Sequence, residues 1–350
     1  MTAPRPNNFP AVLAASQESD MQRFNAPSPL RRGMGFTAIA LAALAVAATA
    51  RSQPAGAPGS WTAKAPLPVA RNEVAAVALN DRIYVLGGSY PRQKYDVADN
   101  GEYDPATDRW RARAPMPQGL NHLGAVALNG KVYVVGGFTG SNHKDVNDGA
   151  FEYDPAADTW RALPPLASPR GSVAIAAVAG KLHALGGRRN ENDVVTAHQV
   201  YDPATGKWSE AAPLPRGRDH MAAVVIEGKI HLVGGRFGAN EDMTGLHDIY
   251  DLASNAWTSA PPVPTPRGGG AGTLFQGMIV LLGGEDDRRT YNENEGFDLS
   301  SNRWLRLAPM PTGRHGFGAA ALGKYLYIAS GAKGTGAGEP TNELLAFSLP

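Results

Sequence analysis

Five arginines recur at one place in a regular pattern along the chain, and their guanidinium groups are suited to anion binding. Each arginine stands ten residues after a tryptophan. A guanidinium group holds a carboxylate or a phosphate through paired hydrogen bonds. The constant spacing predicts that the five groups occupy equivalent positions of a repeated unit. They are Arg71, Arg170, Arg218, Arg267 and Arg314, and Leu120 takes the sixth place.

Residues that can exchange protons stand next to this series. A carboxylate and a histidine held together can act as general acid and base on a bound substrate. Two pairs meet this requirement, Glu73 with His122 and Asp219 with His220. Polar residues at loop ends are more often simply solvated, and that explanation stays open for both pairs. The candidate ligand-binding residues beside the arginine positions are Asn121, His122 and His315.

The sequence contains no motif for metal binding or for thiol chemistry. The chain has no cysteine, so it holds no disulfide, thiolate metal site or cysteine nucleophile. His183 and His231 take the place that tyrosines hold in other units, and we expect them to pack in the core. Another three histidines show no ligand spacing: His143, His198 and His247. We therefore predict neither a metal site nor a cofactor.

The elements that position these residues repeat about every 49 residues. Each unit contains an apolar run ending in a glycine pair, then an aromatic-Asp step, then a tryptophan seven residues after the aromatic. Four short strands per unit at this period predict a propeller blade. The tryptophans are Trp61, Trp110, Trp160, Trp208, Trp257 and Trp304, and the glycine pairs begin at Gly87, Gly136, Gly186, Gly234 and Gly283, with Ser330-Gly331 in the last unit.

These motifs resemble the kelch repeat, in which a glycine pair, Tyr-Asp and a tryptophan follow one another. The resemblance covers Trp61 to Pro350 and recurs six times. It implies an all-β fold, a six-bladed propeller with four antiparallel strands per blade. The chain opens with a lone fourth strand at Trp61 and ends with a lone third strand at Leu344–Ser348. We expect the first strand to complete the last blade and remove the open sheet edges.

The arginines should ring the mouth of the central channel. They begin strand one, the innermost strand of a blade, and they share a face with the variable loops between strands two and three. The kelch domains of ubiquitin-ligase adaptors are similar here, and the resemblance implies that these arginines bind acidic segments of partners. Leu120 interrupts the ring. A bond from each arginine to backbone carbonyls of a neighbouring blade is the competing interpretation.

Residues 1–60 lack the motifs of the repeats. Arg31-Arg32, an apolar run from Phe36 to Ala50 and the Ala48-Thr49-Ala50 ending predict a secretory signal peptide cleaved after Ala50. The run is shorter than the roughly 20 residues of a membrane span, so we expect no stable span after cleavage. The start at Met1 or Met21 and the Sec or twin-arginine route stay open. The predicted organisation is 1–50 extension and signal, 51–60 linker, and 61–350 propeller.

These features favour a secreted or periplasmic binding module for an anionic small molecule, a glycan or an acidic protein segment. The net charge of +1 argues against nucleic acid as a partner. The alternative is a cofactor-free mutarotase or epimerase acting on an acidic sugar, because secreted bacterial sialic-acid mutarotases resemble this chain in architecture. Copper chemistry like that of galactose oxidase is excluded, since it needs a cysteine. A scaffold without a pocket ligand is a third interpretation, and the sequence does not give the oligomeric state.

Overall fold

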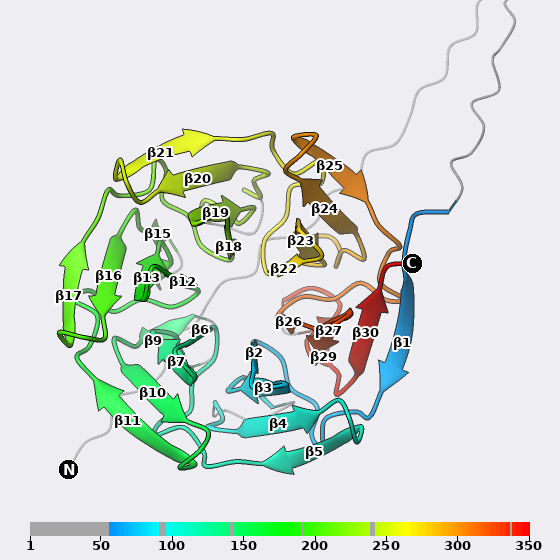
Figure 1. Ribbon diagram of the computed structural model, residues 1–350, viewed down its shortest axis with the longest axis horizontal. Helices are drawn as coiled ribbons and strands as arrows, with labels where there is room; N and C mark the ends of the chain where they lie inside the picture. Colours follow the sequence, from blue (N-terminus) through cyan, green and yellow to red (C-terminus); the bar gives the residue numbers. More distant parts are fainter. Residues whose placement is uncertain (1–55, 91–95, 141–142, 191, 239–241, 337) are drawn as a thin grey trace, which may run out of the picture. The chain divides into compact units, whose positions relative to one another are not determined.

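The structure is a computed structural model that describes residues 56–90, 96–140, 143–190, 192–238, 242–336 and 338–350. The predicted signal peptide and the first half of the predicted linker lie outside these residues. Within them, the chain forms six four-stranded antiparallel sheets arranged around a central axis (Figure 1). The six-bladed propeller of kelch repeats is therefore confirmed. No helix in the described ranges is long and apolar enough to cross a membrane.

In blades one to five the strands run outward from the axis in chain order, and in blade six the N-terminal strand takes the outer place. The strands of blades one to three are β2 (Ala75–Leu79), β3 (Arg82–Leu86), β4 (Asn100–Asp104) and β5 (Arg109–Ala112); β6 (Gly124–Leu128), β7 (Lys131–Val135), β10 (Ala150–Asp154) and β11 (Thr159–Leu163); and β12 (Ala174–Val178), β13 (Lys181–Leu185), β16 (His198–Asp202) and β17 (Lys207–Glu210).

Blades four to six continue the same order. Their strands are β18 (Ala222–Ile226), β19 (Lys229–Val233), β20 (His247–Asp251) and β21 (Ala256–Ser259); β22 (Ala271–Phe275), β23 (Met278–Leu282), β24 (Asn294–Asp298) and β25 (Arg303–Arg306); and β26 (Gly318–Leu322), β27 (Tyr325–Ala329), β30 (Leu344–Ser348) and β1 (Ser60–Lys64). In blade six, β1 is the outer strand and pairs with β30, so that Trp61 lies opposite Phe347. The two strands lie side by side in Figure 1.

Among the described residues, three small hairpins extend the loops between strands two and three. They are β8 (Phe138–Gly140) with β9 (Lys144–Val146), β14 (Arg188–Asn190) with β15 (Asp193–Val194), and β28 (Ala332–Lys333) with β29 (Glu339–Pro340). These hairpins belong to blades two, three and six. The sequence places its length variation in the same loops, so the variable segments gather on one face of the propeller.

The repeated residues hold the blades together through local bonds. In blade one, the Tyr103 hydroxyl donates to Asp108 Oδ1 at 2.6 Å, and Asp104 accepts from the Ala106 backbone N–H at 2.9 Å, which fixes the turn between strands three and four. The Trp110 indole N–H donates to the carbonyl of Ala65 at 2.8 Å, in the segment that enters the blade. Every one of the six repeat tryptophans makes the corresponding bond.

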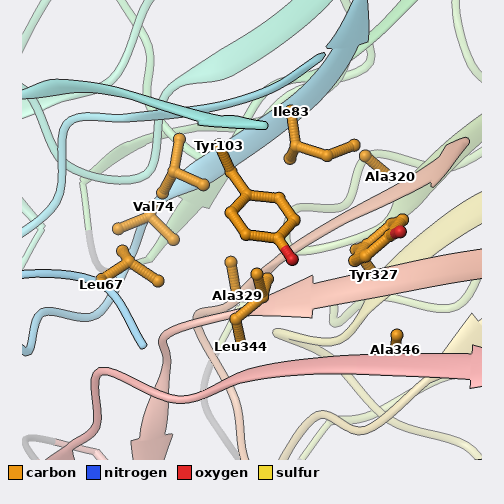
Figure 2. Packing of buried hydrophobic residues seen from close by; sticks show 10 residues of the cluster. Leu67, Val74, Ile83, Tyr103, Ala320, Tyr327, Ala329, Leu344 and Ala346 are labelled. Carbon is orange, nitrogen blue, oxygen red and sulfur yellow. The ribbon is translucent and has the colours of Figure 1, made fainter. Parts of the chain in front are cut away.

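The core consists of seams between neighbouring blades. Figure 2 shows the seam between blades one and six, where Tyr103 from β4 faces Tyr327 from β27, with ring centroids 5.9 Å apart. Leu67, Val74 and Leu344 are buried in the same seam. Six clusters of this kind join each blade to the next. Apolar burial of this kind is the main favourable term in folding, so the ring is stabilised blade against blade.

Candidate functional site

The five recurring arginines lie inside the blades. Their side chains are 0–4 % exposed, and each guanidinium group reaches between strands two and three of its own blade. Arg267 shows the pattern fully, because it donates to the carbonyls of Gly283, Leu281 and Thr265 and pairs with Glu295 at 2.5 Å. The expected ring of arginines around the channel mouth is therefore corrected, because the arginines are buried inside the blades. They bond backbone carbonyls, as in the competing interpretation, but the carbonyls belong to the same blade and not to a neighbouring one.

The reason for this placement lies in the glycine pair. The pair ends strand two and leaves carbonyl groups without partners in the sheet, and a buried carbonyl needs a donor. Arg170 Nε donates to the carbonyl of Gly186 at 2.9 Å, and Arg218 Nε donates to that of Gly234 at 3.1 Å. Burial lowers the pKa of Arg170 to about 10 and also lowers the pKa of Arg218, whose neighbour Asp248 acts in the opposite direction. Arg71 and Arg314 also bond carbonyls, and they pair with Asp99 and Glu343.

The residues at the channel mouth come two positions after the arginine positions. These six residues all have a left-handed backbone, and they are Glu73, His122, Ser172, His220, Gly269 and Gly316. Backbone bonds connect several of them from blade to blade, such as His122 N–H to Glu73 O at 3.2 Å and Ser172 N–H to His122 O at 2.9 Å. A left-handed backbone conformation costs energy at any residue other than glycine, and such residues are concentrated at functional sites. Four of the six positions here carry side chains.

One half of the mouth combines two carboxylates with two histidines. Glu73 lies 3.0 Å from His122 Nε2 through Oε2 and 3.4 Å from His315 Nε2 through Oε1. His315 Nδ1 lies 3.5 Å from Glu285. Burial alone would raise the pKa of Glu73, but the histidines hold it well below its ordinary range. Burial lowers the pKa of His315, yet Glu73 and Glu285 outweigh this effect and raise it overall.

The other half centres on a buried carboxylate. Asp219 Oδ2 lies 2.9 Å from His220 Nδ1 and 3.2 Å from Arg188 Nε, while Oδ1 lies 3.1 Å from Arg236 Nε. Burial would raise the pKa of Asp219, but His220 and the two arginines lower it overall. The pKa of His220 falls to about 4, mainly because of burial and then because of Arg236. Asp219 thus stays ionised and His220 neutral near pH 7.

A fourth histidine, His143, joins the two halves. The ring centroid of His143, next to β9, lies 4.6 Å from that of His122 and 5.3 Å from that of His220. The ligand nitrogens of these three residues lie within 4.8 Å of one another. We call the whole set the mouth cluster: Glu73, His122, His143, Arg188, Asp219, His220, Arg236, Glu285 and His315.

Beneath the mouth cluster the first strands of all six blades line a central cavity of about 300 Å³. Its walls are mainly small and apolar, as at Ala76, Ala125, Ile175 and Ala319. Charged groups are expensive to bury without partners, so a polar ligand is better accommodated at the mouth than in the cavity. The chemistry of this face is therefore concentrated in the mouth cluster.

About half of these residues are among the candidates that the sequence offers. The structure brings together both proposed acid–base pairs, Glu73 with His122 and Asp219 with His220. It also places His315 in the cluster and Asn121 beside it, with Asn121 Oδ1 2.5 Å from His122 Nδ1. Their binding or catalytic roles stay predictions.

Arg188, Arg236, Glu285 and His143 were missed. The first three directly follow glycine pairs, and this position varies in type from blade to blade. In each blade it forms a β-bridge with the residue after the arginine position, as Arg236 does with Asp219. The recurring position after the glycine pair could have been recognised in the sequence. His143 lies in a variable loop and had no comparable signal.

The fold and the mouth cluster define a kelch-type propeller with a polar, partly strained site at the end of its channel. The sequence matches the KLHDC2/KLHL20/DRC7 Kelch-repeats domain over residues 59–235 and 168–331, and the chain belongs to this family. Among solved structures, one titled "Structure of YjhT" is similar, with a TM-score of 0.69 and 18 % identity over 80 % of this chain and 95 % of that chain. This identity shows the fold alone. No curated protein matched the sequence.

Proposed function

We propose that the protein is a binding module that takes a small anionic ligand, such as an acidic sugar, at the mouth cluster. The observation that carries this proposal is the convergence of nine side chains from all six blades at one end of the channel. Groups with strongly shifted pKa values gathered in one place are typical of functional sites. The predicted signal peptide supports a periplasmic or secreted setting.

The charge of one half of the cluster favours an anion. The guanidinium groups of Arg188 and Arg236 lie beside the carboxylate of Asp219, and both neighbouring histidines have lowered pKa values. A carboxylate on the ligand could accept paired hydrogen bonds from a guanidinium group.

The test is a thermal-shift comparison of the purified protein with sialic acid, glucuronic acid and neutral galactose. A ligand at 100 times its dissociation constant stabilises the folded state by about 2.7 kcal/mol. We expect the acidic sugars to raise the melting temperature and galactose to leave it unchanged. The shift should disappear in Arg188→Gln.

Arg189→Gln is the matched control. Arg189 is the next residue in the chain, is exposed, and pairs with Asp193 at 2.7 Å away from the cluster. This variant should keep the full shift. Equal shifts with galactose would remove the argument from charge. If only an acidic peptide raised the melting temperature, the partner would be a protein segment instead of a sugar.

A mutarotase acting on an acidic sugar is the second candidate, and the two histidine–carboxylate contacts favour it. Opening a sugar ring requires one group to take the proton of the anomeric hydroxyl and another to protonate the ring oxygen. The ring centroids of His122 and His220 lie 5.0 Å apart, and each histidine contacts its own carboxylate. The mouth therefore brings two histidine–carboxylate pairs, both candidates for proton transfer, close to each other.

NMR measurement of anomer exchange in sialic acid tests this candidate. Removing one positioned acid or base typically lowers a rate by about 10²–10⁴-fold. We expect Glu73→Gln to reduce exchange by this amount, and Arg189→Gln to have no effect. If the unaltered protein bound the ligand but exchange ran at the uncatalysed rate, the mutarotase would be excluded. The binding module would then be the one remaining proposal.

A further inference from the structure

We propose that His122, His143 and His220 form a binding site for a transition-metal dication of the Zn²⁺ type. The three imidazoles come from two blades, since His122 and His143 belong to blade two and His220 to blade four. Their ligand nitrogens already lie within 4.8 Å of one another. Zinc binds imidazole nitrogen at about 2.0–2.1 Å, so modest side-chain rotation brings all three into contact with one ion.

Two of the histidines already point lone pairs at a common point. Arg236 Nη2 lies 3.3 Å from His143 Nε2 and 3.3 Å from His220 Nε2. A guanidinium group only donates, so both Nε2 atoms act as acceptors there. The position between them therefore already attracts a cation. Metal entry requires the Arg236 terminus to withdraw, and its Nε remains beside Asp219 Oδ1 at 3.1 Å.

The outer contacts of the histidines fit metal ligands. A metal-bound histidine usually donates its second ring N–H to a carboxylate or carbonyl oxygen. His220 Nδ1 faces Asp219 Oδ2 at 2.9 Å, and His122 Nδ1 faces the side-chain oxygen of Asn121 at 2.5 Å. In both residues Nε2 is the ring nitrogen that faces the rest of the mouth cluster, beside Arg236 for His220 and beside Glu73 for His122.

Glu73 supplies the fourth ligand. Its Oε2 lies 3.0 Å from His122 Nε2, so a proton or a metal ion must occupy the space between these two acceptor atoms. Three histidines with one carboxylate, or with one open position, suit Zn²⁺ and related borderline ions better than Ca²⁺ or Mg²⁺, which prefer oxygen ligands.

The experiment titrates Zn²⁺ alone into the full-length protein after chelator treatment, with calorimetry as the readout. Co²⁺ in a parallel titration reports coordination through its visible absorption. We expect one ion per chain and a tetrahedral Co²⁺ spectrum. Asp219→Asn should weaken binding by about 10–100-fold, as loss of an outer-shell partner typically does. His143→Gln should weaken it further, and it alters a half-buried residue outside the blade strands, so the fold should persist.

His183→Gln is the control. His183 Nδ1 lies 2.9 Å from His198 Nε2, so this variant also breaks up a buried histidine contact, but outside the mouth cluster. It should bind Zn²⁺ like the unaltered protein. Equal Zn²⁺ affinity in the His143→Gln variant, or less than one ion per chain in the unaltered protein, would overturn the proposal. Because no sugar is present, either result leaves the anionic-ligand proposal to be judged separately.

Discussion

Leu120 and Phe151 share one apolar cluster at the place in blade two where blade five holds the buried ion pair of Arg267 with Glu295. Phe151 is the second residue of β10, as Glu295 is of β24. The interruption of the arginine series at Leu120 is therefore a paired replacement, in which both charged partners give way to apolar ones. Replacing a buried ion pair by well-packed apolar residues is often neutral for stability.

Transfer of the blade-two pair into blade five should therefore be tolerated better than loss of one charge. The single substitution Arg267→Leu leaves Glu295 buried without its cation and should cost about 3–5 kcal/mol of unfolding free energy. The double substitution Arg267→Leu/Glu295→Phe should recover much of that loss. Urea denaturation of the two single variants and the double variant measures the coupling. Additive losses would show that the two positions are independent.

The first glycine of each pair should be sensitive to any side chain. Gly87 has a φ of 63°, and an added Cβ would lie 2.4 Å from the Leu120 carbonyl oxygen of the next blade. Gly130 has a φ of 76° with open space around the same atom. Gly130→Ala should cost about 1–2 kcal/mol from backbone strain alone. Gly87→Ala should cost clearly more, and thermal denaturation of both variants would show equal losses if the close contact were unimportant.

Stability should fall as the solution becomes acidic. Burial lowers the pKa of six histidines, and the values for His183, His220, His231 and His247 fall to about 4. The unfolded chain binds these protons near pH 6.5 and the folded chain only near pH 4, so stability is lost as pH falls through this window. His143 and His198 shift in the same direction, whereas His315 has a raised pKa and opposes the trend.

Denaturation at pH 7 and pH 5 measures this acid sensitivity. A shift of two pKa units corresponds to about 3 kcal/mol for one histidine. The variant His183→Tyr/His198→Asn installs the pair that blade one carries as Tyr84 and Asn100, and it should flatten the pH dependence. Arg189→Gln, an exposed substitution, should leave the slope unchanged. A variant with an unaltered slope would mean that these two histidines do not contribute.

The outer strand of blade six should be held by Trp61. Its indole N–H donates to the Ala308 carbonyl at 3.0 Å, and its ring lies 5.0 Å from that of Phe347. Trp61→Ala should speed hydrogen exchange in β30, because β1 is joined to this blade by pairing and packing and lacks a hairpin connection to it. The matched variant Trp304→Ala removes the same residue from β25, which a short turn joins to β24. Equal exchange in β30 for both variants would contradict this expectation.

The blades could be predicted from the sequence because their determinants are local. The glycine pair, the Tyr-Asp step and the tryptophan each fix a turn or a seam in every repeat, so recurrence alone identified the fold. The direction of the arginine side chains could not be read this way. A residue at the start of a strand can face the channel or the blade, and the free carbonyls of the glycine pair determine the outcome for Arg170 and Arg218.

The mouth cluster depends on contacts between blades, which spacing along the chain does not encode. Glu73 and His122 belong to neighbouring repeats and were paired correctly. His143 meets His220 across two blades and a variable loop, a contact that only the closed ring creates. The sequence could indicate which face carries the chemistry, while the partners of each side chain required the three-dimensional arrangement.

The pairing of β1 with β30 sets an order of events during synthesis. Ser60 and Ser348 are separated by 288 residues, so the strand that leaves the ribosome first among the described strands waits for the one that leaves last. Bringing such distant segments together costs about 5 kcal/mol of chain entropy, and long-range pairings are slow to form. The nascent propeller therefore keeps two open sheet edges until translation is almost complete.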